Sequence, residues 1–209
     1  MATLLLRMVG PMQSWGITSR FGERDSRSEP SKSGVLGLVC AALGRDRAES
    51  IEDLAALLMG VRVDVEGALV RDYHTALNVV NAKGGSRDTV LTNRYYLADA
   101  AFWVGLEGSE TLLTQCNAAL RRPVWPIFLG RKSCLPSEPI WSEAGVVAQP
   151  LVPALSSCPW LGSGSKPERV RLVVEDSLGS ISRSDQPAGP FAERRFTFRR
   201  LRQEFVSCT

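Results

Sequence analysis

Histidine, paired cysteines and long apolar runs are scarce in this sequence. Its 209 residues include one histidine, His74, and five cysteines, none of them in a CxxC pair. A zinc site and a disulfide framework are therefore both disfavoured. The longest apolar run, at 35–43, is far below the ~20 residues of a membrane helix, and the N-terminus lacks the basic-then-apolar order of a secretory signal. We expect a cytoplasmic protein with no membrane segment, no metal and no cofactor.

Enough apolar residues are present to build a sizeable core. Hydrophobic residues make up 44% of the chain and charged residues 22%, a balance that excludes a disordered chain. The length suits one large domain or two small ones.

Positive charge is rich in arginine and unevenly distributed. Lysine and arginine total 25 against 22 acidic residues, a net charge of +3, and lysine occurs only at 32, 83, 132 and 166. Residues 121–134 hold four basic residues and no acidic one, and residues 191–209 hold five basic and two acidic. Guanidinium groups suit phosphates and base stacking, although a GC-rich genome produces the same skew. Basic segments that coincide with loops indicate a polyanionic partner.

Periodicity predicts an alternation of strands and helices. A long irregular loop at 10–34 follows the first strand, and Ser31 or Ser33 would cap the next helix, which stops at Gly44. The expected elements are a buried strand at 3–9, a helix at 35–43, a capping-box helix from Ser50 to Leu58, a half-exposed strand at 61–65, a hairpin at 69–97 turning at Lys83-Gly84-Gly85-Ser86, a strand at 100–106, a helix at 109–120 and a strand at 124–128.

The order strand, helix, strand, strand, helix, strand is typical of a ferredoxin-like unit, which many RNA-recognition modules share. Residues 135–168 are rich in Pro and Ser without a clear period, and alternation returns at 170–174 and 195–199. We therefore expect an α+β fold with an RNA-binding domain at 1–134, followed at 135–209 by an extended connection and a smaller C-terminal β region.

One loop combines the groups that contact phosphate. Gly130, Arg131, Lys132 and Ser133 follow a predicted strand and offer a flexible backbone, two cations and a hydroxyl. The GxxxxGK[ST] pattern of a Walker A loop is absent. A solvated basic turn is the alternative.

A helix start and the hairpin supply further candidates. Lys32 and Ser33 open the helix at 35–43, where free N–H groups attract anions, although ordinary capping explains the serine equally well. His74, beside Tyr73, could act as a general base near a 2′-hydroxyl, but a lone histidine is more often a packing residue. Arg94 precedes two tyrosines that could stack on bases or pack across the hairpin.

Six ordered motifs carry a family resemblance over nearly the whole chain. They are GPMQSWG at 10–16, SKSGVLGL at 31–38, RDYHT at 71–75, RYYL at 94–97 followed by DAAF at 99–102, FLGRKSC at 128–134 and FAERR at 191–195. Together they closely resemble the signatures of the CRISPR-associated Cas-five family, in its type I-E form.

The resemblance implies a non-catalytic subunit of Cascade, a surveillance complex of antiviral defence. Such a subunit binds the 5′ handle of the mature CRISPR RNA and caps one end of the complex. It would contact a Cas-seven-type backbone subunit and the large subunit, and would meet target DNA only indirectly. The implied fold is ferredoxin-like (RRM/RAMP-like) with a protruding hairpin thumb.

The motifs and the resemblance together predict two sets of RNA-binding residues. The first set comprises Lys32, Ser33, Arg94, Gly130, Arg131, Lys132 and Ser133. A wider set comprises Gln13, Trp15, Arg20, Tyr73 and His74. The alternative function is a metal-independent endoribonuclease that processes CRISPR repeat RNA, because related proteins of another subtype cut precursor RNA.

Overall fold

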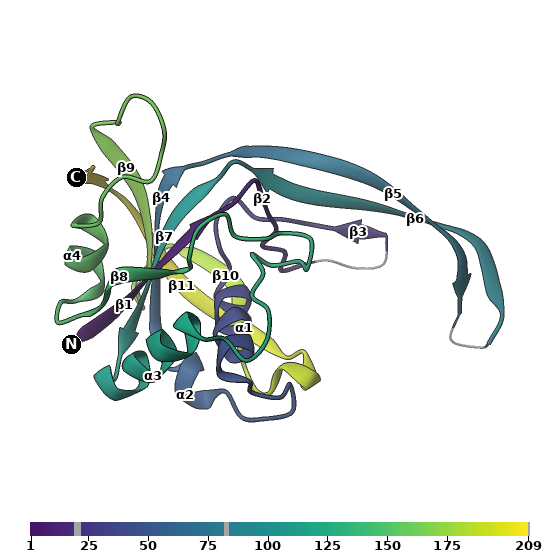
Figure 1. Cartoon of the computed structure of the whole chain (residues 1–209), viewed down its shortest axis with the longest axis horizontal. Coiled ribbons are helices and arrows are strands. Elements are labelled where there is room, and N and C mark those ends of the chain that lie inside the picture. Colours follow the sequence, from purple (N-terminus) through teal and green to yellow (C-terminus); the bar gives the residue numbers. More distant parts are fainter. Residues whose placement is uncertain (19–21, 82–83, 209) are drawn as a thin grey trace.

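A seven-stranded antiparallel sheet is the centre of the computed structural model, which describes residues 1–18, 22–81 and 84–208. The strands run in the order β10-β11-β9-β4-β7-β1-β8 (Figure 1). Their bounds are β1 Ala2–Val9, β4 Leu58–Val65, β7 Ala101–Gly108, β8 Trp141–Val147, β9 Arg169–Glu175, β10 Ile181–Pro187 and β11 Phe196–Ser207. The fold is therefore α+β with a mainly antiparallel sheet.

Helices cover both faces of this sheet. On one face lie α1 (Lys32–Leu43), α3 (Glu110–Arg121) and the short α2 (Glu52–Ala55), and on the other lies α4 (Leu151–Ser156) (Figure 1). Successive residues of β1 alternate between the two cores, because strand side chains point to opposite faces. Leu4 and Leu6 belong to the larger core with α1 and α3, whereas Leu5 packs with α4. This double burial explains why apolar residues predominate on both faces of the strand at 3–9.

Local signals predict α1 accurately. The hydroxyl of Ser31 accepts a hydrogen bond from the backbone N–H of Gly34, and Gly44 ends the helix in a left-handed conformation with φ of 73°. Val35, Val39 and Ala42 are buried on the side that faces the sheet. The predicted caps of this helix are confirmed.

A long two-stranded hairpin projects from the body of the protein (Figure 1). It consists of β5 (Ala68–Val80) and β6 (Ser86–Ala98), paired antiparallel along their whole length. At the tip, the N–H of Asn81 donates to the carbonyl of Gly85; Lys83, predicted in this turn, lies outside the described residues. The short strands β2 (Met12–Gln13) and β3 (Glu23–Arg24) pair with the base of β6. The predicted hairpin is confirmed, and the loop at 10–34 is less irregular than predicted.

The predicted helix from Ser50 to Leu58 is wrong in its extent. The helix ends at Ala55, and Leu58 begins β4 with its side chain 46% exposed. Asp53 forms no capping box and instead makes a bidentate ion pair with Arg45. Hydrogen bonding by Arg45 is the main cause that lowers the pKa of Asp53.

The prediction that β4 is half exposed is also wrong. Arg62 is completely buried, because α4 and the segment after it cover this face. Its Nε lies 2.8 Å from Oδ1 of Asp64, and its Nη1 donates to the carbonyls of Leu155 and Cys158. The alternation of Val with charged residues predicted the strand correctly but not its environment.

The strand predicted at 124–128 does not form. The N–H groups of Val124 and Trp125 instead donate to the carbonyls of Ala42 and Ala41, so this segment caps the C-terminal end of α1. The strand that follows α3 is β8, inside the predicted extended connection. Because β8 to β11 join the same sheet as β1, the sheet continues across residue 134.

The cysteines are packing residues. All five are buried, and none forms a disulfide. Burial raises the pKa of Cys40 and of Cys116 to about 11, so these thiols stay protonated at neutral pH. Among the described helices, none is long and apolar enough to cross a membrane.

Candidate nucleic-acid interface

The basic loop at 129–134 has a fixed conformation. The N–H of Leu129 donates to the carbonyl of Cys134, and the N–H of Ser14 donates to the carbonyl of Leu129. Gly130 has a φ of +95°, and a Cβ added there would lie 1.8 Å from the carbonyl oxygen of Ser14. Only glycine permits this approach, and the loop it forms leaves Lys132 exposed to solvent.

Arg131 is held beneath this loop. Its guanidinium lies over the ring of Tyr96 at 4.7 Å from the centroid, and its Nη2 donates to the carbonyl of Arg24 at 2.8 Å. Its Nη1 is buried and, within the described part of the chain, has no hydrogen-bond partner. Arg131 therefore has an oriented donor left over after its internal contacts.

Trp15 and Gln13 support the start of α1 from inside the protein. A Cβ added at Gly34 would lie 2.9 Å from the ring of Trp15, so the indole packs directly on the first turn of the helix. The indole N–H donates to Oε1 of Gln13, whose amide donates to the carbonyls of Met8 and Ala100. Both side chains, predicted as RNA contacts, are buried and internally bonded. Their position favours a supporting role.

Lys32 is also inside the protein. Its Nζ lies 2.9 Å from Oε1 of Glu175, and its backbone N–H donates to Asp185. Arg199 pairs with both carboxylates, so two cations and two anions form a buried cluster. Burial lowers the pKa of Lys32 despite the opposing effect of Glu175. The Lys32 ammonium, predicted to meet phosphate, is thus already paired, whereas Ser33 beside it is partly exposed.

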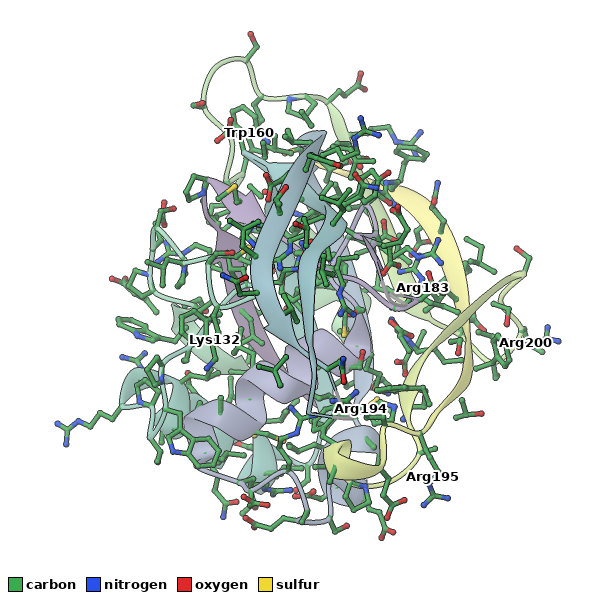
Figure 2. The ribbon with its side chains drawn as sticks, turned by 90° about the vertical axis from the view of Figure 1, so that its right-hand side faces the viewer. Lys132, Trp160, Arg183, Arg194, Arg195 and Arg200 are labelled. Atoms are coloured by element: carbon green, nitrogen blue, oxygen red, sulfur yellow. The ribbon has the colours of Figure 1, made fainter. Side chains whose placement is uncertain are left out.

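Two adjoining hollows form a groove across the start of α1. Their volumes are about 650 Å³ and about 350 Å³, and they share Ser33, Gly34, Gly130 and Phe191. The residues that distinguish them include Trp125, Phe128, Arg47 and Lys132 in the larger hollow and Arg24, Arg131 and Phe196 in the smaller one. Figure 2 shows Lys132 on one side of this region and Arg194 and Arg195 on the other. Aromatic walls with cations at the rim suit a single-stranded nucleic acid.

Acidic residues at the groove are engaged internally. Oδ2 of Asp25 accepts hydrogen bonds from the N–H groups of Ile17 and Thr18 and from the Thr18 hydroxyl. The carboxylate of Asp46 accepts from the N–H of Ala48. These bonds tie both carboxylates to their own loops.

The hairpin residues are spread out from this groove. Arg94 pairs in register with Asp72 and lies beside Arg24 of β3, which places it at the hairpin base. Tyr73, 60% exposed, and His74 lie farther along β5. Arg20 falls outside the described residues. The described residues contain no cluster of His, Cys, Asp or Glu suited to a metal ion.

The structure thus brings Ser33 and the loop Gly130–Ser133 together at the groove. Arg94 adjoins this site through β3, whereas Tyr73 and His74 do not line the groove. Sequence reasoning missed Arg24, Trp125 and Phe196 as groove residues. The available signal was the concentration of aromatic and basic residues at 191–200.

Comparison with known proteins agrees with this architecture. Residues 3–202 match the family model described as CRISPR-associated protein (Cas_Cas5). The chain is 35% identical over 204 residues to the CRISPR system Cascade subunit CasD of Escherichia coli (strain K12), covering 89% of this chain and 83% of the relative. A crystal structure of a Cas protein superposes with a TM-score of 0.82 at 48% identity, covering 98% of this chain and 95% of that one. A chain of a CRISPR RNA-guided surveillance complex superposes with a TM-score of 0.84 at 31% identity, covering 99% and 90%. The sequence and the fold thus lead to one conclusion, that this chain belongs to the CRISPR-associated Cas-five family.

Proposed function

We propose that the chain is a non-catalytic component of a type I-E Cascade surveillance complex that binds the 5′ handle of the mature CRISPR RNA and caps one end of the complex. The observation that carries this proposal is the glycine-fixed loop Gly130–Ser133, which presents Lys132 at the rim of an aromatic groove. Support also comes from the similarity to a Cascade subunit and to a chain of a surveillance complex.

Each part of the groove has a proposed role. Lys132 and Ser133 contact phosphates, as exposed cations and hydroxyls do in backbone recognition. Arg131 lines the smaller hollow and adds positive charge beside a bound phosphate, and Ser33 adds a hydroxyl beside the positive end of α1. Lys32 fixes the start of α1 through its ion pairs rather than meeting the RNA.

The remaining architecture has a proposed meaning as well. The order β4-β7-β1-β8, with α1 after β1 and α3 after β7, supports a ferredoxin-like unit. The hairpin of β5 and β6 would act as the thumb, with Arg94 at its base near the RNA. The neighbours in the complex would be a Cas-seven-type backbone subunit and the large subunit.

We propose no cleavage role for His74. Its side chain is exposed on β5, and within the described residues it makes no hydrogen bond to an acid or base. General acid–base cleavage needs a second group placed opposite the first. Repeat RNA incubated with the protein, with EDTA or with divalent metal, should stay intact. Site-specific cutting that His74→Ala abolishes would favour the endoribonuclease instead.

The salt dependence of RNA binding tests the proposed site. Each lost single-strand phosphate contact lowers the slope of log K against log salt by about 0.7, so Arg131→Ala/Lys132→Ala should lower it by up to about 1.4. Lys166→Ala, which removes an exposed lysine from another loop, is the matched control and should leave the slope unchanged. A double variant with the wild-type slope would refute the phosphate role of the loop.

A further inference from the structure

The first half of β11 exposes two phenylalanines on one face of the sheet. Phe196 is 42% exposed and Phe198 is 71% exposed. Side chains two residues apart share a face of a strand, so Phe196, Phe198 and Arg200 form one surface, which we call the β11 face. Arg199 and Leu201, on the opposite face, are buried.

The first half of β11 pairs with β10 alone, because β9 pairs only with the second half, from Leu201 to Ser207. The helix α4 packs against Val206, near the far end of β11, together with Leu172 and Val174 of β9. The β11 face lies outside that cover. Exposed aromatic side chains that sit together on a sheet mark a binding surface more often than a solvated one.

Arginines flank these two phenylalanines in the sequence. Arg194 and Arg200 are exposed, and within the described residues neither has an acidic partner. Arg195 pairs with Glu193 and remains largely exposed. Figure 2 shows Arg195 and Arg200 extending outward from this part of the sheet. Flat aromatic rings can stack on bases, and guanidinium groups can bind the phosphates that join those bases.

The β11 face is continuous with the groove. Phe196 lines the smaller hollow together with Ser33 and Arg131, and Phe198 lies about 6.6 Å farther along the strand at the usual rise per residue. RNA-recognition sheets use aromatic residues in this way to stack two or three bases. An RNA strand that leaves the groove past Phe196 would reach Phe198 next.

We propose that the β11 face is a stacking surface for single-stranded RNA, on which Phe196 and Phe198 take successive bases of the strand that leaves the groove. This inference rests on the proposed function in taking RNA as the groove's ligand. A protein partner is the competing occupant, but the exposed arginines at 194, 195 and 200 favour a polyanion.

The test uses the full chain and a fluorescein-labelled oligoadenylate of twelve nucleotides, followed by fluorescence anisotropy. Stacking contributes about 1–3 kcal/mol per base, so Phe198→Ala should weaken binding roughly 5- to 140-fold. Phe198→Tyr keeps the ring and should retain most of the affinity. Phe205→Ala is the matched control, because Phe205 is 53% exposed on the same strand but on the opposite face.

Three outcomes separate the possibilities. Equal affinities for Phe198→Ala and Phe205→Ala would overturn the stacking role. Unchanged RNA affinity with reduced co-purification of other Cascade subunits would also overturn it and identify a protein contact. Weakened binding by Phe198→Ala alongside a wild-type salt slope for Arg131→Ala/Lys132→Ala would keep the β11 face and reject the proposed loop site instead.

Discussion

Replacing Gly130 with alanine should disrupt the proposed RNA-binding loop more than the small size of the added methyl group suggests. The backbone at this position has a φ of +95°, and the new Cβ would lie 1.8 Å from the carbonyl oxygen of Ser14. Neither that carbonyl nor the loop can move alone, because the N–H of Ser14 is bonded to Leu129. We therefore expect the whole loop to shift and to displace Arg131 and Lys132.

A second glycine variant separates the cost of a positive φ from the cost of the backbone clash. A non-glycine residue at positive φ costs about 1–3 kcal/mol, which lowers Tm by roughly 2–12 °C in a chain of this size. Gly84→Ala should show at most this strain, because Gly84 has a φ of +83° with nothing within 4 Å of the added Cβ and lies at the hairpin tip, where local rearrangement limits the loss of Tm. Gly130→Ala should add the backbone clash and so lose more Tm than Gly84→Ala.

Two measurements on both variants test this reasoning. Thermal unfolding followed by circular dichroism gives the Tm difference, and anisotropy with handle RNA gives the affinity. Gly130→Ala should bind RNA as weakly as Arg131→Ala/Lys132→Ala, whereas Gly84→Ala should bind like the wild type. If the two glycine variants agree in both Tm and affinity, the contact with Ser14 does not shape the site.

Three further predictions follow from buried charge and from the hairpin. Lys32→Met should lower the free energy of unfolding in urea by about 3–5 kcal/mol, because it removes one of the two cations that pair with the buried carboxylate of Glu175. The salt slope of RNA binding should stay unchanged, and a changed slope would mean that Lys32 contacts the RNA. Burial alone would raise the pKa of Glu29, but Arg183 and other partners lower it below 4.5. The contribution of Glu29 to stability is therefore complete above pH 4.5 and is lost as pH falls. Glu29→Gln should make Tm fall less steeply below pH 4.5, and an unchanged fall would contradict this. Replacing residues 80–87 with Asn-Gly should leave Tm nearly unchanged but weaken incorporation into the RNA-bound complex, whereas loss of soluble protein would mean that the tip supports the fold.

Elements specified by nearby residues could be predicted from the sequence. The helix α1 carries its own caps at Ser31 and Gly44, and the hairpin carries its own turn glycines and alternating strands. The loop Gly130–Ser133 was identified from its composition, because a glycine, two cations and a hydroxyl are adjacent in the chain. Each of these signals lies within one element.

Features that depend on distant partners could not be predicted. The sequence pattern predicts that Arg62 lies at the surface. It is buried because the carbonyls of Leu155 and Cys158, more than 90 residues later, accept its hydrogen bonds. The burial of Lys32 could not be predicted for the same reason, since its partner Glu175 follows it by 143 residues. Val124 and Trp125 have a strand-like pattern, but the free carbonyls at the end of α1 take their N–H groups.

The buried cluster of Lys32 also constrains how the protein is made. A ribosome adding about 5–20 residues per second needs roughly 7–30 s to synthesise the 143 residues between Lys32 and Glu175. Throughout that interval the Lys32 ammonium lacks the Glu175 carboxylate that pairs with it in the interior, so we expect the first turn of α1 to stay exposed to water. Arg199, which completes the cluster, emerges later still. We therefore expect α1 to complete its packing only after β11, the last strand, has emerged.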